Sequence, residues 1–286
     1  MKTALRTLAA LLLSTGPTAA ASTHGHLVII GGGERPSYLI EEIVTLAGGL
    51  EARLVIIPVA SSEPTETAEY QKEQFEKAGA GEVDYLLFDA GTVDAPEHLA
   101  AVERATGIFL SGGDQRRLTE AMNGSQLLEG VRRLYARGGV VAGTSAGAAV
   151  MSPLMITGDE HLNDDPDQAF ETIKAGNIDT RPGFGLLPGT IVDQHFVARR
   201  RHNRLISLVL EHPELLGIGI DESTAIVVGP PNRFEVRGES LVVIYDAARA
   251  ERTGTDGNGN LSGSDLQLHV LRNGQAFDLE QRTPIR

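Results

Sequence analysis

Short apolar runs recur along the first half of the chain, and each ends on glycine, alanine or a polar residue. They cover residues 26–33, 52–60, 84–90, 107–113 and 138–145. The stretches between them place apolar residues at helical spacing, and several close on glycine, as helices often do. Strands that alternate with amphipathic helices form βαβ units. The sequence therefore predicts an α/β fold with a mostly parallel sheet and helices on both of its faces.

After residue 190 the apolar runs follow one another closely, with one clear helix near 199–212. This spacing predicts strands and hairpins added to the edge of the sheet. The polar, glycine-rich segment 251–265 is typical of a mobile surface loop. Residues 256–265 of this segment, "DGNGNLSGSD", are similar to a calcium-binding loop, but Leu261 stands where that motif requires glycine. We therefore expect no metal ion there and no cofactor elsewhere.

The length and composition of the chain favour one large domain. Of its 286 residues 41% are hydrophobic, and no internal repeat or linker rich in proline or serine divides it. Residues 1–21 have the layout of a secretory signal, with two basic residues, an apolar stretch at 8–13 and small residues just before Ser22. We expect cleavage before Ser22 and a single catalytic domain over 22–286. The alternative is a disordered or helical start on a cytosolic protein.

The charge balance excludes some partners. The chain has 25 Lys and Arg against 38 Asp and Glu, and the predicted signal holds two of the basic residues and no acidic one, which leaves a net charge of −15. Nucleic acids and anionic membranes bind clustered positive charge, so neither is an expected partner, whereas a cationic substrate would be attracted. The chain has no cysteine, which excludes thiol catalysis, thiolate metal sites and disulfides.

The pentapeptide "GTSAG" at 143–147 matches the pattern G-x-S-x-G, in which a serine sits on a sharp turn between a strand and a helix. It follows a buried-strand pattern and precedes an alanine-rich one, so Ser145 is a candidate nucleophile. The alternative is a structural turn. The backbone amides of Gly113, in a second glycine turn, and Ala146 are candidates for an oxyanion hole. The alternative for Gly113 is a turn without a catalytic role.

A nucleophilic serine needs a base and a carboxylate that orients the base. His195 closes the strand-like run "TIVDQH", where its ring would reach the carboxyl end of the sheet. The alternative is a structural histidine. The segment after the serine offers four acids, of which Glu160 is favoured over Asp159; the others are Asp164 and Asp165.

Five segments together resemble the cyanophycinases of the dipeptidase E-like serine peptidases, family S51. In chain order they read "IIGGGE", "FLSGGDQRRL", "GTSAGAAVM", "GFGLLPGTIVDQHFVARRRHNRL" and "LGIGIDESTAIVV", and the similarity runs from about residue 25 to 275. The resemblance implies a flavodoxin-like or class I glutamine amidotransferase-like fold. It also implies an exopeptidase that acts on cyanophycin, a polyaspartate with arginine on each side chain, and releases β-Asp-Arg dipeptides.

The resemblance also implies roles for individual residues. Ser145 would be the nucleophile and His195 the base, while the acid after the serine is less sharply matched. The implied substrate-binding residues are Gln115, Asp193, Gln194, Arg199, Arg201 and Arg204. Guanidinium groups pair bidentately with carboxylates, and this substrate carries free carboxylates. The alternative for the three arginines is a solvated basic helix face.

Several functional readings stay open at this point. An apparent signal peptide, absent from intracellular members of the family, suggests an extracellular scavenging enzyme. A homodimer is expected, although nothing in the sequence itself sets the oligomeric state. A glutamine amidotransferase would need a cysteine nucleophile, and an α/β-hydrolase would need its acid and histidine farther downstream and an HGGG-type loop. The open alternatives are a dipeptidase E-like or isoaspartyl peptidase of other specificity and a non-catalytic arginine- or peptide-binding exported protein.

Overall fold

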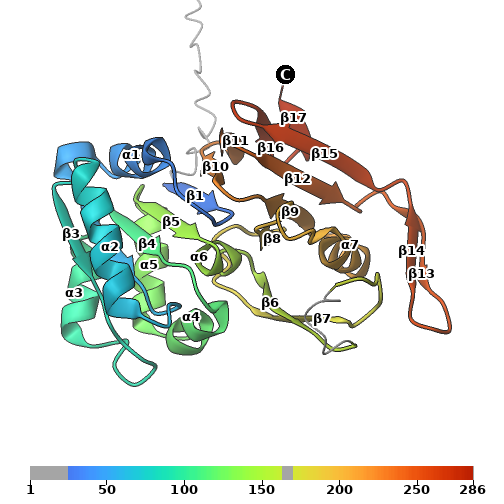
Figure 1. Cartoon of the computed structure of the whole chain (residues 1–286), viewed down its shortest axis with the longest axis horizontal. Helices are drawn as coiled ribbons and strands as arrows, with labels where there is room; N and C mark the ends of the chain where they lie inside the picture. The colour runs from blue at the N-terminus through green and yellow to red at the C-terminus, as the bar shows by residue number, and fades with distance from the viewer. Residues whose placement is uncertain (1–24, 163–169, 286) are drawn as a thin grey trace, which may run out of the picture.

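A nine-stranded sheet forms the centre of the computed structural model, which describes residues 25–162 and 170–285 (Figure 1). Its strands are β1 His26–Ile30, β2 Arg53–Ile57, β3 Glu82–Tyr85, β4 Gly107–Leu110, β5 Val140–Thr144, β10 Thr224–Gly229, β11 Arg233–Gly238, β16 Ala276–Asp278 and β17 Thr283–Ile285. They lie in the order β17-β16-β11-β10-β1-β5-β4-β2-β3. The predicted signal at 1–21 lies outside the described residues.

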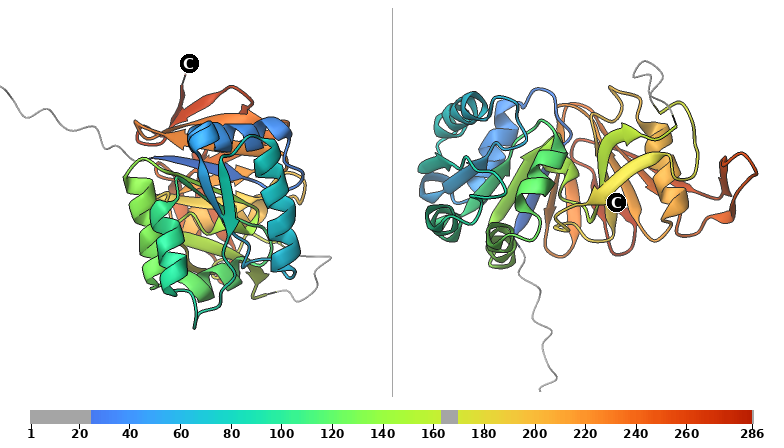
Figure 2. Two further views of the ribbon diagram at one scale, coloured as in Figure 1. Left: turned by 90° about the vertical axis from the view of Figure 1, so that its left-hand side faces the viewer. Right: turned by 90° about the horizontal axis from the view of Figure 1, so that it is seen from below.

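The half of this sheet from β1 to β3 is parallel and is covered by helices on both faces. These helices are α1 Ser37–Leu46, α2 Pro64–Lys77, α3 Pro96–Arg104, α4 Gln115–Met122, α5 Gln126–Ala136 and α6 Ala146–Ala149, with a short 3₁₀ turn at Gly49–Glu51. The first two pack on one face, and α3 to α6 pack on the other (Figure 2). The seventh helix, α7 His202–Glu211, lies outside this half. Strands β1, β2 and β5 are almost wholly apolar because both faces are buried. The predicted parallel sheet with helices on both faces is confirmed.

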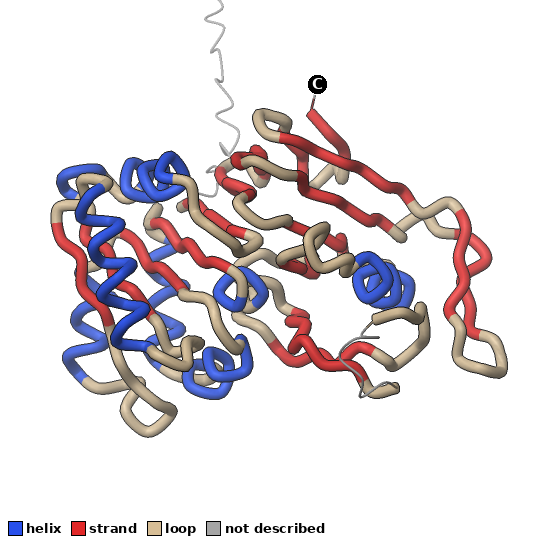
Figure 3. Tube along the Cα trace, in the orientation of Figure 1, coloured by secondary structure: helices blue, strands red, loops and turns tan. Residues whose placement is uncertain are grey.

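The C-terminal strands differ in part from the expectation. As predicted, β10, β11, β16 and β17 extend the first sheet, and all of their pairings are antiparallel. A separate sheet in the order β15-β12-β9-β8 contains β8 Thr190–Gln194, β9 Leu216–Ile220, β12 Leu241–Asp246 and β15 Gln267–Arg272. Helix α7 packs on β9 because Gly217 lets Leu205 and Val209 approach the strand. Figure 3 shows that this C-terminal part is mainly strand and loop around α7.

Two hairpins complete the described structure. The first joins β6 Leu154–Glu160 to β7 Ile178–Pro182, and the second joins β13 Glu251–Thr255 to β14 Leu261–Ser264. The second hairpin projects from the body and replaces the predicted loop at 251–265 (Figure 1). At its tip the Asp256 carboxylate accepts hydrogen bonds from the backbone of Asn258 and from Asn260, which lower the pKa of Asp256. Local bonds of this kind allow a polar, exposed segment to form strands.

Two possible features are not found in the described part of the chain. None of its helices is long and apolar enough to cross a membrane. Within the same residues, no group of three or more His, Asp or Glu side chains is arranged to hold a metal ion.

The fold brings the ends of three strands together. Ser145 follows β5 of the nine-stranded sheet, His195 follows β8 of the four-stranded sheet, and Glu222 lies two residues after β9. In α/β sheets ligands bind at the carboxyl ends of the strands. The junction between the two sheets is therefore the place to look for a site.

Candidate active site

Ser145 occupies the strained turn that the G-x-S-x-G pattern predicts. Its backbone has φ +52° and ψ −110°, between the end of β5 and the start of α6. A Cβ atom on Gly143 would lie 2.5 Å from the carbonyl oxygen of Gly147, and one on Gly147 would lie 2.1 Å from that of Leu110. Both glycines are required because the turn leaves no room for side chains. The side chain of Ser145 is left partly exposed.

His195 stands within hydrogen-bond distance of Ser145. The Ser145 Oγ to His195 Nε2 distance is 3.0 Å, and the histidine side chain is only 9% exposed. His195 also has a positive φ of +48°, and its backbone N–H donates to the Gly31 carbonyl at 2.7 Å. Gly32 lies against the imidazole, since a Cβ atom there would be 2.3 Å from His195 Cε1. The glycine loop after β1 therefore forms one wall of the histidine site.

The carboxylate that faces His195 is Glu222, which the sequence analysis did not select. Its Oε1 lies 2.5 Å from His195 Nδ1. Glu222 follows the apolar run of β9, in the segment "LGIGIDE". The rule that pointed to His195, polar side chains at the carboxyl ends of buried strands, would have found it. The predicted acids all came from the segment that follows Ser145.

The prediction of Glu160 as this acid is wrong. Its Oε1 accepts the Phe170 backbone N–H and its Oε2 accepts Asn177 Nδ2, so it holds the β6–β7 hairpin together. The alternative, Asp159, pairs with Arg116 at 2.6 Å. Asp164 and Asp165 lie outside the described residues. Closeness to Ser145 in sequence misled the assignment because β6 carries Glu160 into the hairpin with β7, where its carboxylate has partners of its own.

The surroundings of His195 favour the neutral imidazole. Burial lowers the pKa of His195, and the nearby positive charges of Arg199 and Arg201 lower it further, whereas the hydrogen bond and charge of Glu222 act in the opposite direction. A neutral imidazole whose Nδ1–H is held by Glu222 presents Nε2 as a proton acceptor to Ser145. The three side chains can thus perform general-base activation of a hydroxyl nucleophile.

The loop after β4 passes close to Ser145. A Cβ atom on Gly112 would lie 3.4 Å from Ser145 Cβ, and Gly113, with φ +137°, is packed against the backbone of Ala60. Ala146 is the first residue of α6, where backbone N–H groups point out of the helix end. Gly113 and Ala146 thus lie on the two segments next to the hydroxyl. Their role as an oxyanion hole stays a prediction.

Three predicted substrate-binding residues have partners inside the protein. Asp193 and Arg204 form a bidentate ion pair, and their side chains are 0% and 1% exposed. Direct contact with a substrate is therefore contradicted for both of them. Gln115 uses its amide nitrogen to hold β6, donating to the carbonyls of Ile156 at 2.8 Å and Thr157 at 2.6 Å.

The other three predicted residues lie around the turn that follows His195. Arg201 is largely buried and donates to the carbonyl of Gln194 at 2.8 Å, and burial together with the charge of Arg204 lowers the pKa of Arg201 to about 10. Gln194 is 6% exposed, and its Oε1 has no hydrogen-bond partner among the described residues. Arg199 is exposed. Of the three predicted arginines, Arg199 is therefore the one open to a substrate carboxylate.

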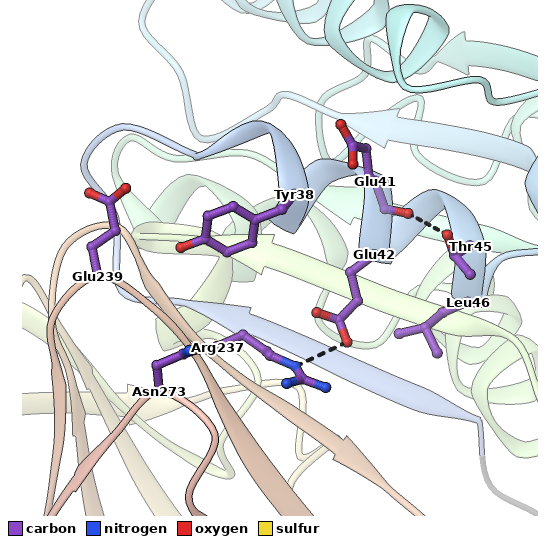
Figure 4. Close-up of a pocket in the computed structure, with 8 residues that line it drawn as sticks. All are labelled: Tyr38, Glu41, Glu42, Thr45, Leu46, Arg237, Glu239 and Asn273. Atoms are coloured by element: carbon purple, nitrogen blue, oxygen red, sulfur yellow. Dashed lines mark hydrogen bonds and ion pairs between the residues drawn. The ribbon is translucent and has the colours of Figure 1, made fainter.

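A surface groove of about 770 Å³ is lined by residues other than those of this site (Figure 4). Ser145, His195 and Glu222 do not line it. The groove runs between α1 and the turn from β11 to β12, and the Glu239 backbone N–H at its edge donates to the Ser223 carbonyl. Its lining contains three glutamates and one arginine, and it consists of Tyr38, Glu41, Glu42, Thr45, Leu46, Arg237, Glu239 and Asn273.

Comparison with known proteins agrees with this geometry. The model of peptidase family S51 matches residues 27–231. A cyanophycinase of Synechococcus elongatus is 36% identical over 272 residues, which cover 90% of this chain and 82% of that protein. One of Trichormus variabilis is 37% identical over 271 residues, 92% of this chain and 88% of that protein. A peptidase E of Salmonella paratyphi A is 29% identical over 155 residues, 51% of this chain and 66% of that protein.

Solved structures share the fold. A peptidase from an acI-B1 Actinobacterium has a TM-score of 0.66 at 23% identity, with 91% of this chain and 98% of that chain covered. A putative peptidase E from Listeria monocytogenes EGD-e has a TM-score of 0.50 at 18% identity, with 76% and 100% covered. Because the family model spans more than half of the chain and relatives above 30% identity extend over most of it, the chain belongs to peptidase family S51 and is a serine peptidase.

Proposed function

We propose that the protein is a cyanophycinase, an exopeptidase that hydrolyses cyanophycin to β-Asp-Arg dipeptides. The observation that carries the proposal is the line of Ser145, His195 and Glu222 at the junction of the two sheets, with separations of 3.0 Å and 2.5 Å. Similarity to cyanophycinases over about 90% of the chain supports the substrate. Peptidase E, in contrast, matches only about half of the chain.

In this proposal Ser145 is the nucleophile and His195 the general base. As Ser145 Oγ attacks the scissile carbonyl carbon, its proton passes to His195 Nε2, and Glu222 stabilises the imidazolium through Nδ1–H. His195 then gives the proton to the leaving nitrogen, the C–N bond breaks and an acyl-enzyme remains. Water, deprotonated by His195, hydrolyses this ester and restores Ser145. Gly113 and Ala146 are the proposed donors to the oxyanion.

Charge supports the substrate class. Cyanophycin carries guanidinium groups and carboxylates, so it can be attracted by the acidic protein as a whole and paired locally by a cation. Arg199 is exposed on the turn after His195, and its charge reaches the imidazole. A guanidinium in that place is suited to a substrate carboxylate. We assign this contact to Arg199, with Arg201 behind it.

The proposal extends to export and assembly. Residues 1–21 would direct secretion, so N-terminal sequencing of protein recovered from culture medium should begin close to Ser22. Recovery of only the uncleaved chain in the cytoplasm would contradict this. The chain would act as a homodimer, and the exposed Leu268 and Val270 on edge strand β15 offer an apolar surface for contact. The molar mass measured by sedimentation equilibrium should be twice that of the chain, and the mass of a monomer would contradict the proposal.

The decisive experiment compares wild type with Ser145→Ala on insoluble cyanophycin, with mass spectrometry of the released products. Wild type should release β-Asp-Arg, and the variant should be slower by several orders of magnitude while it keeps its fold. A serine-directed covalent inhibitor should add its mass to wild type but not to the variant. Equal cleavage of an α-linked Asp-Arg peptide and cyanophycin would instead support a peptidase of other specificity. Failure of the inhibitor to react would favour a binding protein.

A further inference from the structure

Asp221, the residue before Glu222, makes contacts that the proposed reaction does not use. Its Oδ1 accepts the backbone N–H groups of Val197 at 3.0 Å and Ala198 at 2.9 Å. Its Oδ2 accepts the hydroxyl of Ser240 at 2.6 Å. Asp221 is 6% exposed, so this carboxylate is buried and is held by three donors. Such an arrangement holds the partners of the carboxylate as firmly as the carboxylate itself.

The two amides belong to the turn that carries the catalytic histidine. In that turn the N–H of Arg199 donates to the His195 carbonyl, and the N–H of Arg201 donates to the Phe196 carbonyl. The amides of Val197 and Ala198 come earlier, where a helical turn has no partners of its own. Asp221 therefore caps this turn from another strand, as an N-cap side chain caps a helix.

The capped turn starts from a costly backbone conformation. His195, the first residue of the turn, has a positive φ of +48°. Such a φ is uncommon for a residue other than glycine and persists only where the surroundings enforce it. On one side, the His195 N–H is fixed to Gly31. On the other side, the chain is fixed two and three residues later by Asp221. The two anchors together hold the imidazole in front of Ser145.

The backbone of Asp221 belongs to the same junction. Its N–H donates to the Leu241 carbonyl at 3.1 Å. A Cβ atom on Gly31 would lie 2.2 Å from the carbonyl oxygen of Asp221. Because Glu222 is the next residue, the strand end that bears the acid also binds the turn that bears the base. A shift of this one carboxylate would change the Ser145–His195 and the His195–Glu222 distances together.

We propose that Asp221 is a positioning residue that sets the alignment of His195 with both Ser145 and Glu222. The proposal rests on the proposed hydrolase function. In this role Asp221 does not contact the substrate, so the loss of its carboxylate should lower kcat and leave KM nearly unchanged. Displacement of reacting groups by about 1 Å can cost roughly 100-fold in rate. We therefore expect a 10- to 100-fold lower kcat for Asp221→Ala, on the scale of that estimate.

The experiment measures Asp221→Ala, Asp221→Asn and the matched control Ser240→Ala. Asn keeps an acceptor for the two amides, and its amide group can donate to Ser240, so it should retain most of the activity. Ser240→Ala removes one contact of the carboxylate but leaves both bonds to the turn. Its kcat should stay within about twofold of wild type, a change too small for the loss of a transition-state contact.

Three readouts separate positioning from general stability. They are kcat and KM on cyanophycin, the rate constant of inactivation by a serine-directed inhibitor, and the low-field proton resonance of His195 Nδ1–H. For Asp221→Ala, kcat and the inactivation rate should fall together, and the resonance should shift or broaden. A general loss of stability would move none of these far below the melting temperature. If Asp221→Ala does not fold, Asp221→Glu takes its place, since the longer side chain keeps the charge but displaces the turn.

A folded Asp221→Ala protein, or in its absence a folded Asp221→Glu protein, with wild-type kcat and inactivation rate would overturn the proposal. An inert Ser145→Ala variant beside such a protein would leave the proposed function standing. If wild type does not hydrolyse cyanophycin but reacts with the inhibitor, the assignment of cyanophycin as the substrate is refuted. In that case the inactivation rate and the resonance still decide the role of Asp221.

Discussion

Exchange of one carboxylate for an amide tests which acid serves His195. In Glu222→Gln the group 2.5 Å from His195 Nδ1 loses its charge while keeping its size. A glutamine can still accept Nδ1–H, but it no longer stabilises the imidazolium that forms during the reaction. If its NH2 group instead faces His195 Nδ1, it favours the tautomer protonated on Nε2, which cannot accept the Ser145 proton. The expected result is a lower kcat with a folded protein.

The structure sets the size of the loss. A hydrogen bond to a charged group contributes about 1.5 to 3 kcal/mol, and each 1.36 kcal/mol is about tenfold in rate, which gives roughly 10- to 150-fold. The Glu222 side chain is 40% exposed, so water solvates its charge and weakens its effect. We therefore expect a loss of roughly 10- to 100-fold, rather than the roughly 10⁴-fold loss that follows when a buried triad carboxylate becomes an amide.

The assay is kcat on cyanophycin across pH, with Glu160→Gln as the matched control. Glu160 is bonded to Phe170 and Asn177, away from His195, so its kcat should stay within about twofold of wild type, too small a change for a lost transition-state contact. Because Glu222 raises the pKa of His195, its loss should also move the acid limb of kcat/KM to lower pH. A large loss in Glu160→Gln with an unaffected Glu222→Gln would refute the assignment.

Three further substitutions test other parts of the site. Arg199→Gln removes a charge that lowers the pKa of His195, so the acid limb of kcat/KM should move to higher pH, and KM should rise; an unchanged pH profile would contradict this. Arg204→Ala leaves the buried Asp193 without its bidentate partner and with only Arg201, at 3.9 Å, as an ion-pair partner among the described residues, so it should cost about 3 kcal/mol. Tm should fall by roughly 10 °C in a calorimetric scan, whereas an unchanged Tm would show that the pair adds nothing. Gly32→Ala places a methyl group 2.3 Å from the imidazole and should lower kcat by roughly 100-fold, and wild-type kcat would show that the loop yields freely.

Local patterns predicted the parallel half of the fold, because a strand buried on both faces is apolar throughout and its crossover helix is amphipathic. They could not predict the second sheet. Strand β9 is as apolar as β10, and its pairing with β8 and β12 depends on contacts between segments far apart in the chain. The hairpin β13–β14 was also missed, since polar, glycine-rich residues carry little strand signal.

At the site, the glycine turn and the strand end located Ser145 and His195. The acid was missed because the chain supplies it after the histidine, from β9, and the search stopped at the segment after the serine. The arginine row illustrates a different limit. Its residues have the same chemistry in sequence, yet Arg204 is buried with Asp193 while Arg199 faces solvent. Only the packing of α7 distinguishes them.

The split origin of the reacting groups has a consequence for how the molecule is made. The hydroxyl belongs to the nine-stranded sheet, whereas the imidazole and the carboxylate belong to the four-stranded one. A chain in which either sheet has formed alone holds an incomplete set of groups and hydrolyses nothing. Catalytic competence thus requires that both sheets have formed and packed together, and a partly folded chain with only one of them is expected to be inactive.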